Sequence, residues 1–92
     1  REFQDSPVVA LNQAVAIAMS NSLEEGLRRI DALGASGELE RYHLFHAARA
    51  DILRRLERFS EARQAYGQAL MLATNGIEQE YLRRRIAALE DR

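Results

Sequence analysis

The stretch YHLFHAARADILRRLERFSEARQAYGQAL, residues 42–70, contains two runs of apolar side chains at helical spacing, with a short polar break between them. The first run extends upstream and predicts a helix over residues 38–57, whose inward face is formed by Leu39, Tyr42, His46, Ala50, Leu53 and Leu56. The second predicts a helix that Ser60 caps and that turns inward Ala62, Tyr66, Ala69 and Leu70. Small residues at the closest approach allow two such helices to pack as an antiparallel pair.

Two helices are predicted before this stretch, over residues 7–19 and residues 23–33. The first helix begins with Ser6 as N-cap and Pro7 at the first helical position. The second begins with a capping box formed by Ser22 and Glu25, and Gly34 is expected to end it. These signals leave residues 34–37 as the main loop of the chain.

A fifth helix is predicted after the turn signal Asn75-Gly76. Its polar outer face suits a C-terminal capping helix, and its apolar stripe is formed by Ile77, Tyr81, Leu82, Ile86 and Leu89. No stretch alternates between apolar and polar residues as a strand does. The chain is therefore expected to be all-α, with two antiparallel helix pairs and a capping helix.

The two helix pairs form an internal repeat with an offset of 36 residues. Four of the superposed pairs match in size: Ala14 with Ala50, Gly26 with Ala62, Ile30 with Tyr66, and Ile17 with Leu53. In a fifth pair Leu33 coincides with Ala69. The repeat predicts that each pair closes around a small residue, beside which the large side chains fill the remaining space.

The composition excludes several classes of protein. The chain has 92 residues, a net charge of −1 and no cysteine, so it contains neither a disulfide nor a thiolate zinc site. The balanced charge argues against a wholly basic nucleic-acid binder, and no apolar run approaches the ~20 residues of a membrane span. No catalytic or phosphate-binding motif occurs, so the protein is not expected to be an enzyme. All 13 basic residues are arginine, which suggests a GC-rich bacterial genome.

The second helix pair resembles a tetratricopeptide repeat (TPR). Counting from His43, the small, aromatic and Ala-Leu positions of that repeat are filled by Ala50, Ala62, Tyr66 and Ala69-Leu70. The chain departs from the repeat where it places His46 for Trp, Arg49 for Leu, Glu57 for Gly and Thr74 for Pro.

A longer resemblance covers the segments SPVVALNQAVAIAM (residues 6–19), residues 42–70 and EQEYLRRRIAAL (residues 78–89). They resemble the C-terminal extension of one group of extracytoplasmic-function (ECF) RNA polymerase sigma factors. In that family a TPR-like domain follows the promoter-reading and polymerase-binding regions. The resemblance implies a linker over residues 1–6, a TPR-like regulatory domain over residues 7–92, and promoter-contacting residues upstream of Arg1. Glu57 stands where that family usually has Gly.

The first predicted helix carries the candidate interaction surface. Only Asn12 and Gln13 are polar within it, so it is expected to be covered on more than one side, in a tight bundle or by another surface. The concave face would combine Val8, Leu11, Val15 and Ala18 with Leu44, Ala47, Asp51 and Arg54. The predicted protein-interaction residues are Val8, Leu11, Asn12, Val15, Asp51 and Arg54. Replacing Val8 and Leu11 with Asp is expected to abolish docking and leave the helices folded, whereas Asp51 and Arg54 could equally form a solvated helix pair.

Neither a metal nor a cofactor is expected. His43 and His46 lie three residues apart, but a third histidine or a cysteine is missing from the sequence. We expect His46 to pack in the repeat, with its ring bonded to backbone or water. The arginine clusters are expected to form solvated faces rather than phosphate contacts.

The expected partners are the chain's own N-terminal sigma regions or the RNA polymerase core, in the cytoplasm, without direct contact to nucleic acid or membrane. Two alternatives remain open. One is a free-standing TPR-like adaptor that binds a peptide or a partner helix, and the other is a self-associating module, a homodimer paired through the apolar first helix.

Overall fold

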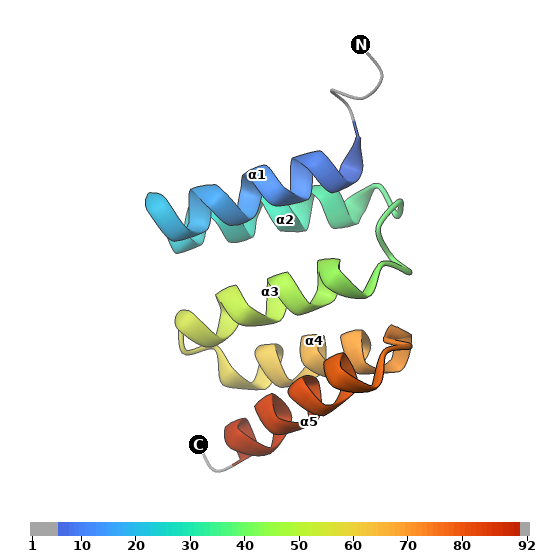
Figure 1. Ribbon diagram of the computed structural model, residues 1–92. Coiled ribbons are helices and arrows are strands. Elements are labelled where there is room, and N and C mark those ends of the chain that lie inside the picture. Colours follow the sequence, from blue (N-terminus) through green and yellow to red (C-terminus); the bar gives the residue numbers. More distant parts are fainter. Residues whose placement is uncertain (1–5, 91–92) are drawn as a thin grey trace.

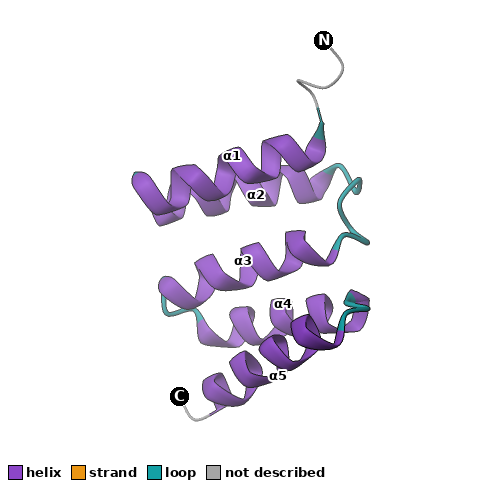
Figure 2. Cartoon of the chain, viewed as in Figure 1, coloured by secondary structure: helices purple, strands orange, loops and turns teal. Residues whose placement is uncertain are grey.

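The computed structural model describes residues 6–90, and these form five α-helices joined by turns, without a strand (Figure 2). The helices are α1 (Pro7–Ser20), α2 (Leu23–Ala35), α3 (His43–Arg55), α4 (Phe59–Leu72) and α5 (Gly76–Glu90). The predicted all-α class and the number of helices are confirmed. Within the described part of the chain, each helix lacks the length or the apolarity needed to cross a lipid bilayer.

The helices form two stacked antiparallel pairs and a fifth helix. α1 packs on α2 and α3 packs on α4, while α5 covers the outer side of the second pair by packing on α4 (Figure 1). The pairs meet mainly through α2 and α3. As a result α1, α3 and α5 lie on one face of the domain, nearer the viewer in Figure 1, and α2 and α4 lie behind them.

The core follows the repeat that the sequence predicts. Ala14 and Ala50 are buried, and so are Ile30 and Tyr66, the bulky partners of the repeat. Gly26 marks the closest approach of α1 and α2, because a Cβ atom at this position would lie only 2.3 Å from the Cβ of Ala18. The equivalent position of the second pair is Ala62, which is fully buried. The positions predicted to be small are therefore those at which two helix backbones nearly touch.

The predicted starts of α3 and α4 need correction, whereas α1 begins at Pro7 as predicted and lacks only the expected cap hydrogen bond. α3 begins at His43, not at residue 38, because residues 36–42 form turns in which Leu39 is nevertheless buried. α4 begins at Phe59, so Ser60 lies inside the helix and does not cap it. Ser6 occupies the N-cap position of α1, yet its hydroxyl makes no capping hydrogen bond.

The capping box of α2 forms only in part. The Ser22 hydroxyl accepts a hydrogen bond from the Glu25 backbone N–H at 3.1 Å, as predicted. The Glu25 carboxylate does not accept the reciprocal hydrogen bond from the Ser22 backbone N–H, because it pairs with Arg28 and Arg29 one turn further along the helix.

Gly34 does not end α2, which continues to Ala35. Gly34 instead lies against the ring of Phe45, and a Cβ atom there would come within 3.0 Å of the ring. The residue with left-handed backbone is Gly37, at φ 80°. Glycine is favoured at such a position because it carries no Cβ.

The apolar stripe predicted for α5 is half correct. Leu82 and Leu89 are buried and Ile86 packs against the core, but Ile77 is 82% exposed and Tyr81 is 47% exposed. A single helix face can turn only part of this set toward α4, and residues 82, 86 and 89 already fill it. The Asn75-Gly76 turn is present, with the Asn75 side chain accepting hydrogen bonds from the backbone N–H groups of Ile77 and Glu78.

Glu57 is the one non-glycine residue with positive φ among residues 6–90, at φ 65°. The turn it occupies is a Schellman motif, because Arg58 N–H donates to the Leu53 carbonyl and Glu57 N–H donates to the Arg54 carbonyl. This motif needs a left-handed residue after the helix end, which glycine adopts without strain.

We therefore expect Glu57→Gly to raise the free energy of unfolding by about 1 kcal/mol, because it removes a left-handed Cβ. Thermal unfolding followed by circular dichroism is the measurement, and the midpoint should rise by roughly 5 °C. Glu57→Ala is the matched control, since it removes the carboxylate and keeps the Cβ, and it should stay near the original midpoint. Equal stabilisation by both variants would show that the carboxylate, not the backbone, is unfavourable.

Candidate protein-interaction groove

A groove of about 310 Å³ lies where α1, α3 and α5 meet on one face of the domain. Its lining is mostly apolar, with polar groups from each helix, and consists of Leu11, Asn12, Val15, Tyr42, Leu44, Ala47, Ala48, Asp51 and Tyr81. We call it the α1/α3/α5 groove. It lies on the face that the repeat predicted as concave, because the first helix of each pair faces that side.

Four of the six predicted interaction residues line this groove. Asn12 is exposed, while Val15 and Asp51 are half-buried. Leu11 also contributes to the lining, but it is only 3% exposed and belongs to the core between α1 and α2. The expectation that Leu11→Asp leaves the helices folded is therefore wrong.

The other two predicted residues lie outside the groove lining. Val8 is 38% exposed at the start of α1, beside the exposed Val9. Arg54 supports the groove indirectly through Asp51. The first helix is thus covered by α2 on one side and retains apolar side chains on its outer surface, which include Val8, Val9 and Met19.

Of the groove residues, the sequence interpretation assigned Tyr42 to the inward face of the third helix and did not single out Ala48. It also missed Tyr81, which it assigned to the apolar stripe of the fifth helix. Its position one residue before Leu82 is the signal that distinguishes it. Residues 82, 86 and 89 form the face toward α4, so residue 81 must point to a neighbouring side. In the structure it lines the α1/α3/α5 groove, and its hydroxyl accepts a hydrogen bond from Arg85 Nε at 3.2 Å.

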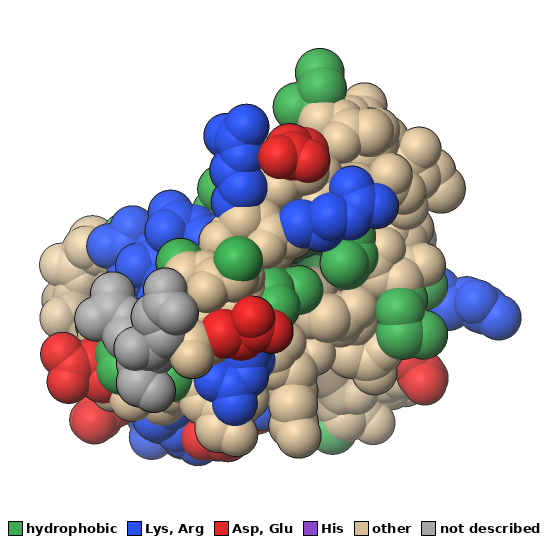
Figure 3. Space-filling model, turned by 90° about the horizontal axis from the view of Figure 1, so that it is seen from below, with side chains coloured by type: hydrophobic (Ala, Val, Ile, Leu, Met, Phe, Trp, Pro, Cys, Tyr) green, Lys and Arg blue, Asp and Glu red, His purple; other side chains and the backbone are tan. Residues whose placement is uncertain are grey.

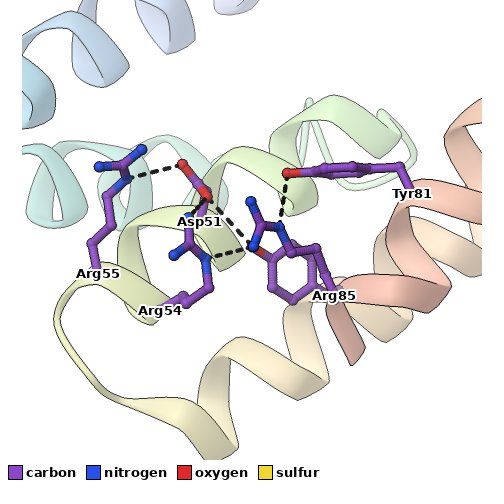
Figure 4. Close-up of polar contacts among 6 residues, drawn as sticks. Asp51, Arg54, Arg55, Tyr81 and Arg85 are labelled. Carbon is purple, nitrogen blue, oxygen red and sulfur yellow. Dashed lines mark hydrogen bonds and ion pairs between the residues drawn. The ribbon is translucent and has the colours of Figure 1, made fainter. Parts of the chain in front are cut away.

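Asp51 is the centre of a polar cluster at one end of the groove (Figure 4). Arg54 Nη2 donates to its Oδ1 at 2.5 Å and Arg55 Nε donates to its Oδ2 at 3.2 Å. Arg54 Nε also donates to the Tyr66 hydroxyl at 3.3 Å, which lies 3.5 Å from Asp51 Oδ1. The cluster is half-buried and joins α3 to α4, so it is more than a solvated pair on one helix.

The cluster changes the ionisation of its members. Burial acts to raise the pKa of Asp51, but the hydrogen bonds and positive charges of Arg54 and Arg55 outweigh it, so this pKa lies below its ordinary value. Burial raises the pKa of the Tyr66 hydroxyl. Asp51 therefore stays ionised and Tyr66 stays neutral at neutral pH.

We expect Asp51 to stabilise the fold in a pH-dependent way. A carboxylate with a lowered folded-state pKa contributes its stability above the unfolded pKa, and this is lost as pH falls through the folded pKa. Asp51→Asn should therefore be less stable than the original chain at neutral pH by on the order of 1 kcal/mol. The difference should shrink in acid, below about pH 4.

Urea unfolding at a series of pH values measures this difference. Glu61→Gln is the control, because Glu61 pairs with Arg58 on the surface, where an ion pair contributes little. A difference between Asp51→Asn and the original chain that stays constant into acid would contradict the assignment.

The histidines make separate contacts. His46 Nε2 lies 2.7 Å from the Glu40 carbonyl oxygen, which confirms the predicted bond of its ring to backbone. His43 Nε2 lies 2.7 Å from Glu78 Oε1 and so joins α3 to α5. Residues 6–90 contain no group of three or more potential metal-binding side chains.

A second groove, of about 670 Å³, lies on the opposite face between α2, α3 and α4. Phe45 and Ala65 contribute to its lining and are buried, and Met71 contributes a side chain that is 80% exposed. Its charged residues are already paired, since Arg49 Nε donates to Asp31 Oδ1 at 2.7 Å.

The surface arginines are also largely paired. Arg58 binds Glu61 and Arg84 binds Glu80, both through exposed side chains. Viewed from below, arginines and carboxylates alternate, with apolar side chains exposed between them (Figure 3). The arrangement does not form a continuous basic surface on this side.

The fold is a small all-α domain built from two helix pairs and a fifth helix. The first helix of each pair lies on the face that carries the α1/α3/α5 groove. An uncharacterized protein of Rhizobium meliloti (strain 1021) is 41% identical to this chain over 81 residues, which are 88% of this chain and 19% of that protein. The chain therefore spans about a fifth of the length of the curated relative it matches. No protein-family profile matches the chain, and no solved structure matches it.

Proposed function

We propose that this chain is the C-terminal regulatory and protein-interaction domain of a bacterial ECF-type RNA polymerase sigma factor. It would act in the cytoplasm, during transcription initiation, by docking on the sigma core or on the polymerase. The observation that carries the proposal is the α1/α3/α5 groove, where an apolar lining opens to solvent between three helices of one face. Such a surface suits contact with another protein better than catalysis, because it is shallow and few polar groups converge in it.

The sequence supports the sigma-factor part of the proposal. The resemblance over residues 6–19, 42–70 and 78–89 falls on α1, on the whole α3–α4 pair and on α5. The Rhizobium relative is consistent with a domain carried by a longer protein, since the matched residues are 19% of it.

The test begins with the gene. We expect the reading frame to continue upstream of Arg1 through a region that ends in a helix-turn-helix pattern. The full-length protein is then compared with a shortened version that ends before Ser6 and so lacks this domain. Binding to core RNA polymerase and promoter-dependent transcription are measured for both. A loss of binding or a changed transcription rate on truncation would support the proposal. A start codon directly before Arg1 would contradict it and favour a free-standing adaptor.

Self-association is the second candidate function, because α1 leaves Val9 40% and Met19 46% exposed on its outer side. Sedimentation equilibrium of the full-length protein distinguishes the two. A stable dimer that Val9→Asp dissociates would favour pairing through α1, whereas a monomer would exclude it.

A further inference from the structure

Three arginines contact residues that line the α1/α3/α5 groove, and two of them share a single carboxylate. Arg54 and Arg55 donate hydrogen bonds to Asp51, and Arg85 donates one to the hydroxyl of Tyr81, which is on the same helix, α5 (Figure 4). Asp51 and Tyr81 both line the groove. Arg54 and Arg55 together carry one positive charge more than the Asp51 carboxylate neutralises. Among the described residues, Arg85 adds a guanidinium whose hydrogen bond is to a hydroxyl and not to a carboxylate.

These arginines retain unused hydrogen-bond donors. A guanidinium carries five N–H donors in a fixed planar fork. Within residues 6–90, Arg55 uses only Nε, toward Asp51, and Arg85 uses only Nε, toward Tyr81. The terminal nitrogens of both side chains are therefore available, and the bonds through Nε fix the direction in which they point. Arg85 also lies over the Tyr81 ring, 5.4 Å from its centroid, which restrains it further.

The remainder of the groove is apolar. Leu44 is 43% exposed and Val15 is half-buried, and the exposed Ile77 extends the apolar surface beyond Tyr81 along α5. Of the acidic side chains of α5 near this surface, Glu80 pairs with Arg84, and Glu78 Oε1 lies 2.7 Å from His43 Nε2. A ligand that fits must therefore bring large apolar groups together with an anionic group.

We propose that the α1/α3/α5 groove binds an acidic amphipathic protein segment, whose carboxylates contact Arg55 and Arg85 and whose apolar side chains pack on Leu44, Val15 and Tyr81. Charge complementarity selects the acidic partner, because bidentate pairing of a guanidinium with a carboxylate is the strongest contact these donors can make. The apolar lining favours a protein segment over nucleic acid, and the net charge of −1 acts in the same direction. This inference rests on the proposed function and names the chemistry of its partner.

Selection from a random peptide library against the intact chain tests the inference while the partner is still unidentified. Enriched peptides should carry Asp or Glu beside Leu, Ile or Phe. The binding of the most enriched peptide is then measured by fluorescence anisotropy, together with that of its amide counterpart, in which Gln and Asn replace Glu and Asp. We expect the amide peptide to bind about tenfold more weakly in total, since it keeps the shape of the acidic peptide but loses the charge-assisted hydrogen bonds to exposed arginines.

Protein variants assign the contact to the named arginines. The double variant Arg55→Gln/Arg85→Gln should weaken binding of the acidic peptide about tenfold and leave the amide peptide unaffected. Arg28→Gln is the matched control, because Arg28 lies on α2, outside the groove lining, is 72% exposed and pairs with Glu25. An absence of enriched peptides, enrichment without acidic residues, or equal weakening by Arg28→Gln would overturn the inference. Displacement of the peptide by single-stranded oligothymidylate at similar concentration would also overturn it.

The outcome is separable from that of the proposed function. If full-length sigma factor docks on polymerase and the arginine double variant docks equally well, the docking proposal stands and the acidic-segment inference fails. If acidic peptides bind through Arg55 and Arg85 while truncation leaves transcription unchanged, the inference stands and the sigma-factor proposal fails.

Discussion

Gly26→Ala is expected to lower the free energy of unfolding by about 2 kcal/mol, by forcing α1 and α2 apart. The new Cβ would lie 2.3 Å from the Cβ of Ala18, 2.7 Å from its Cα and 2.9 Å from its backbone nitrogen. No rotamer change relieves a clash with backbone, so one helix must move. That movement opens the contacts of Ala14 and Ile30, which are buried in the same interface. The clash outweighs the gain of about 1 kcal/mol that Ala brings to a helix interior.

Gly67 provides the matched control for this effect. It lies inside α4, and a Cβ atom there would have no neighbour within 4 Å. Gly67→Ala should therefore raise the free energy of unfolding by up to about 1 kcal/mol, because only the helix propensity changes. Urea unfolding followed by circular dichroism measures both variants. Changes of the same sign at both positions would contradict the close approach of α1 and α2.

The core could be predicted from the sequence because its positions follow the helical period and recur in both helix pairs. Ala14 and Ala50 can be assigned without tertiary contacts, since a small residue at the same place in two repeats already indicates close approach. Gly26 and Ala62 follow the same logic. Here local propensity and packing agree, so the pattern and the structure coincide.

The helix ends could not be predicted equally well, because tertiary contacts determine them. Residues 38–41 are good helix formers, yet the chain must cross from the end of α2 to the start of α3 there. The left-handed Gly37 turns it, and Leu39 is buried in the turn. Propensity alone would continue the helix through this segment. A similar competition explains Gly34, which packs on Phe45 within α2 and does not end that helix.

The groove was predicted in part, because the repeat indicates which helices face one side but not how α5 approaches them. Leu11, Val15 and Asp51 follow from the repeat mapping. Tyr81 and Arg85 belong to α5, which lies outside the two repeats, and their positions depend on the angle at which α5 packs on α4. The helical period shows that Leu82 and Leu89 face inward, and both are buried, but it does not determine the angle at which α5 crosses α4.

Leu11→Asp is expected to unfold the first helix pair, at a loss of about 4 kcal/mol or more, because it places an unpaired carboxylate in the core. Leu11 is 3% exposed, and its neighbours in the core are apolar. Such a loss is a large part of the total stability of a small domain. Circular dichroism and urea unfolding should therefore show a less helical, less cooperative protein, and a docking defect of this variant would report unfolding.

Val8→Asp is the variant that separates docking from folding. Val8 is 38% exposed, so the substitution should change the free energy of unfolding by only about 0.5 kcal/mol. If the outer surface of α1 docks on the sigma core or the polymerase, a carboxylate at this position should weaken binding of the full-length protein, because it must be desolvated in the contact. Pull-down of the full-length protein with core polymerase measures the effect. Unchanged binding of a folded Val8→Asp protein would remove Val8 from the docking surface and leave the α1/α3/α5 groove as its remaining candidate.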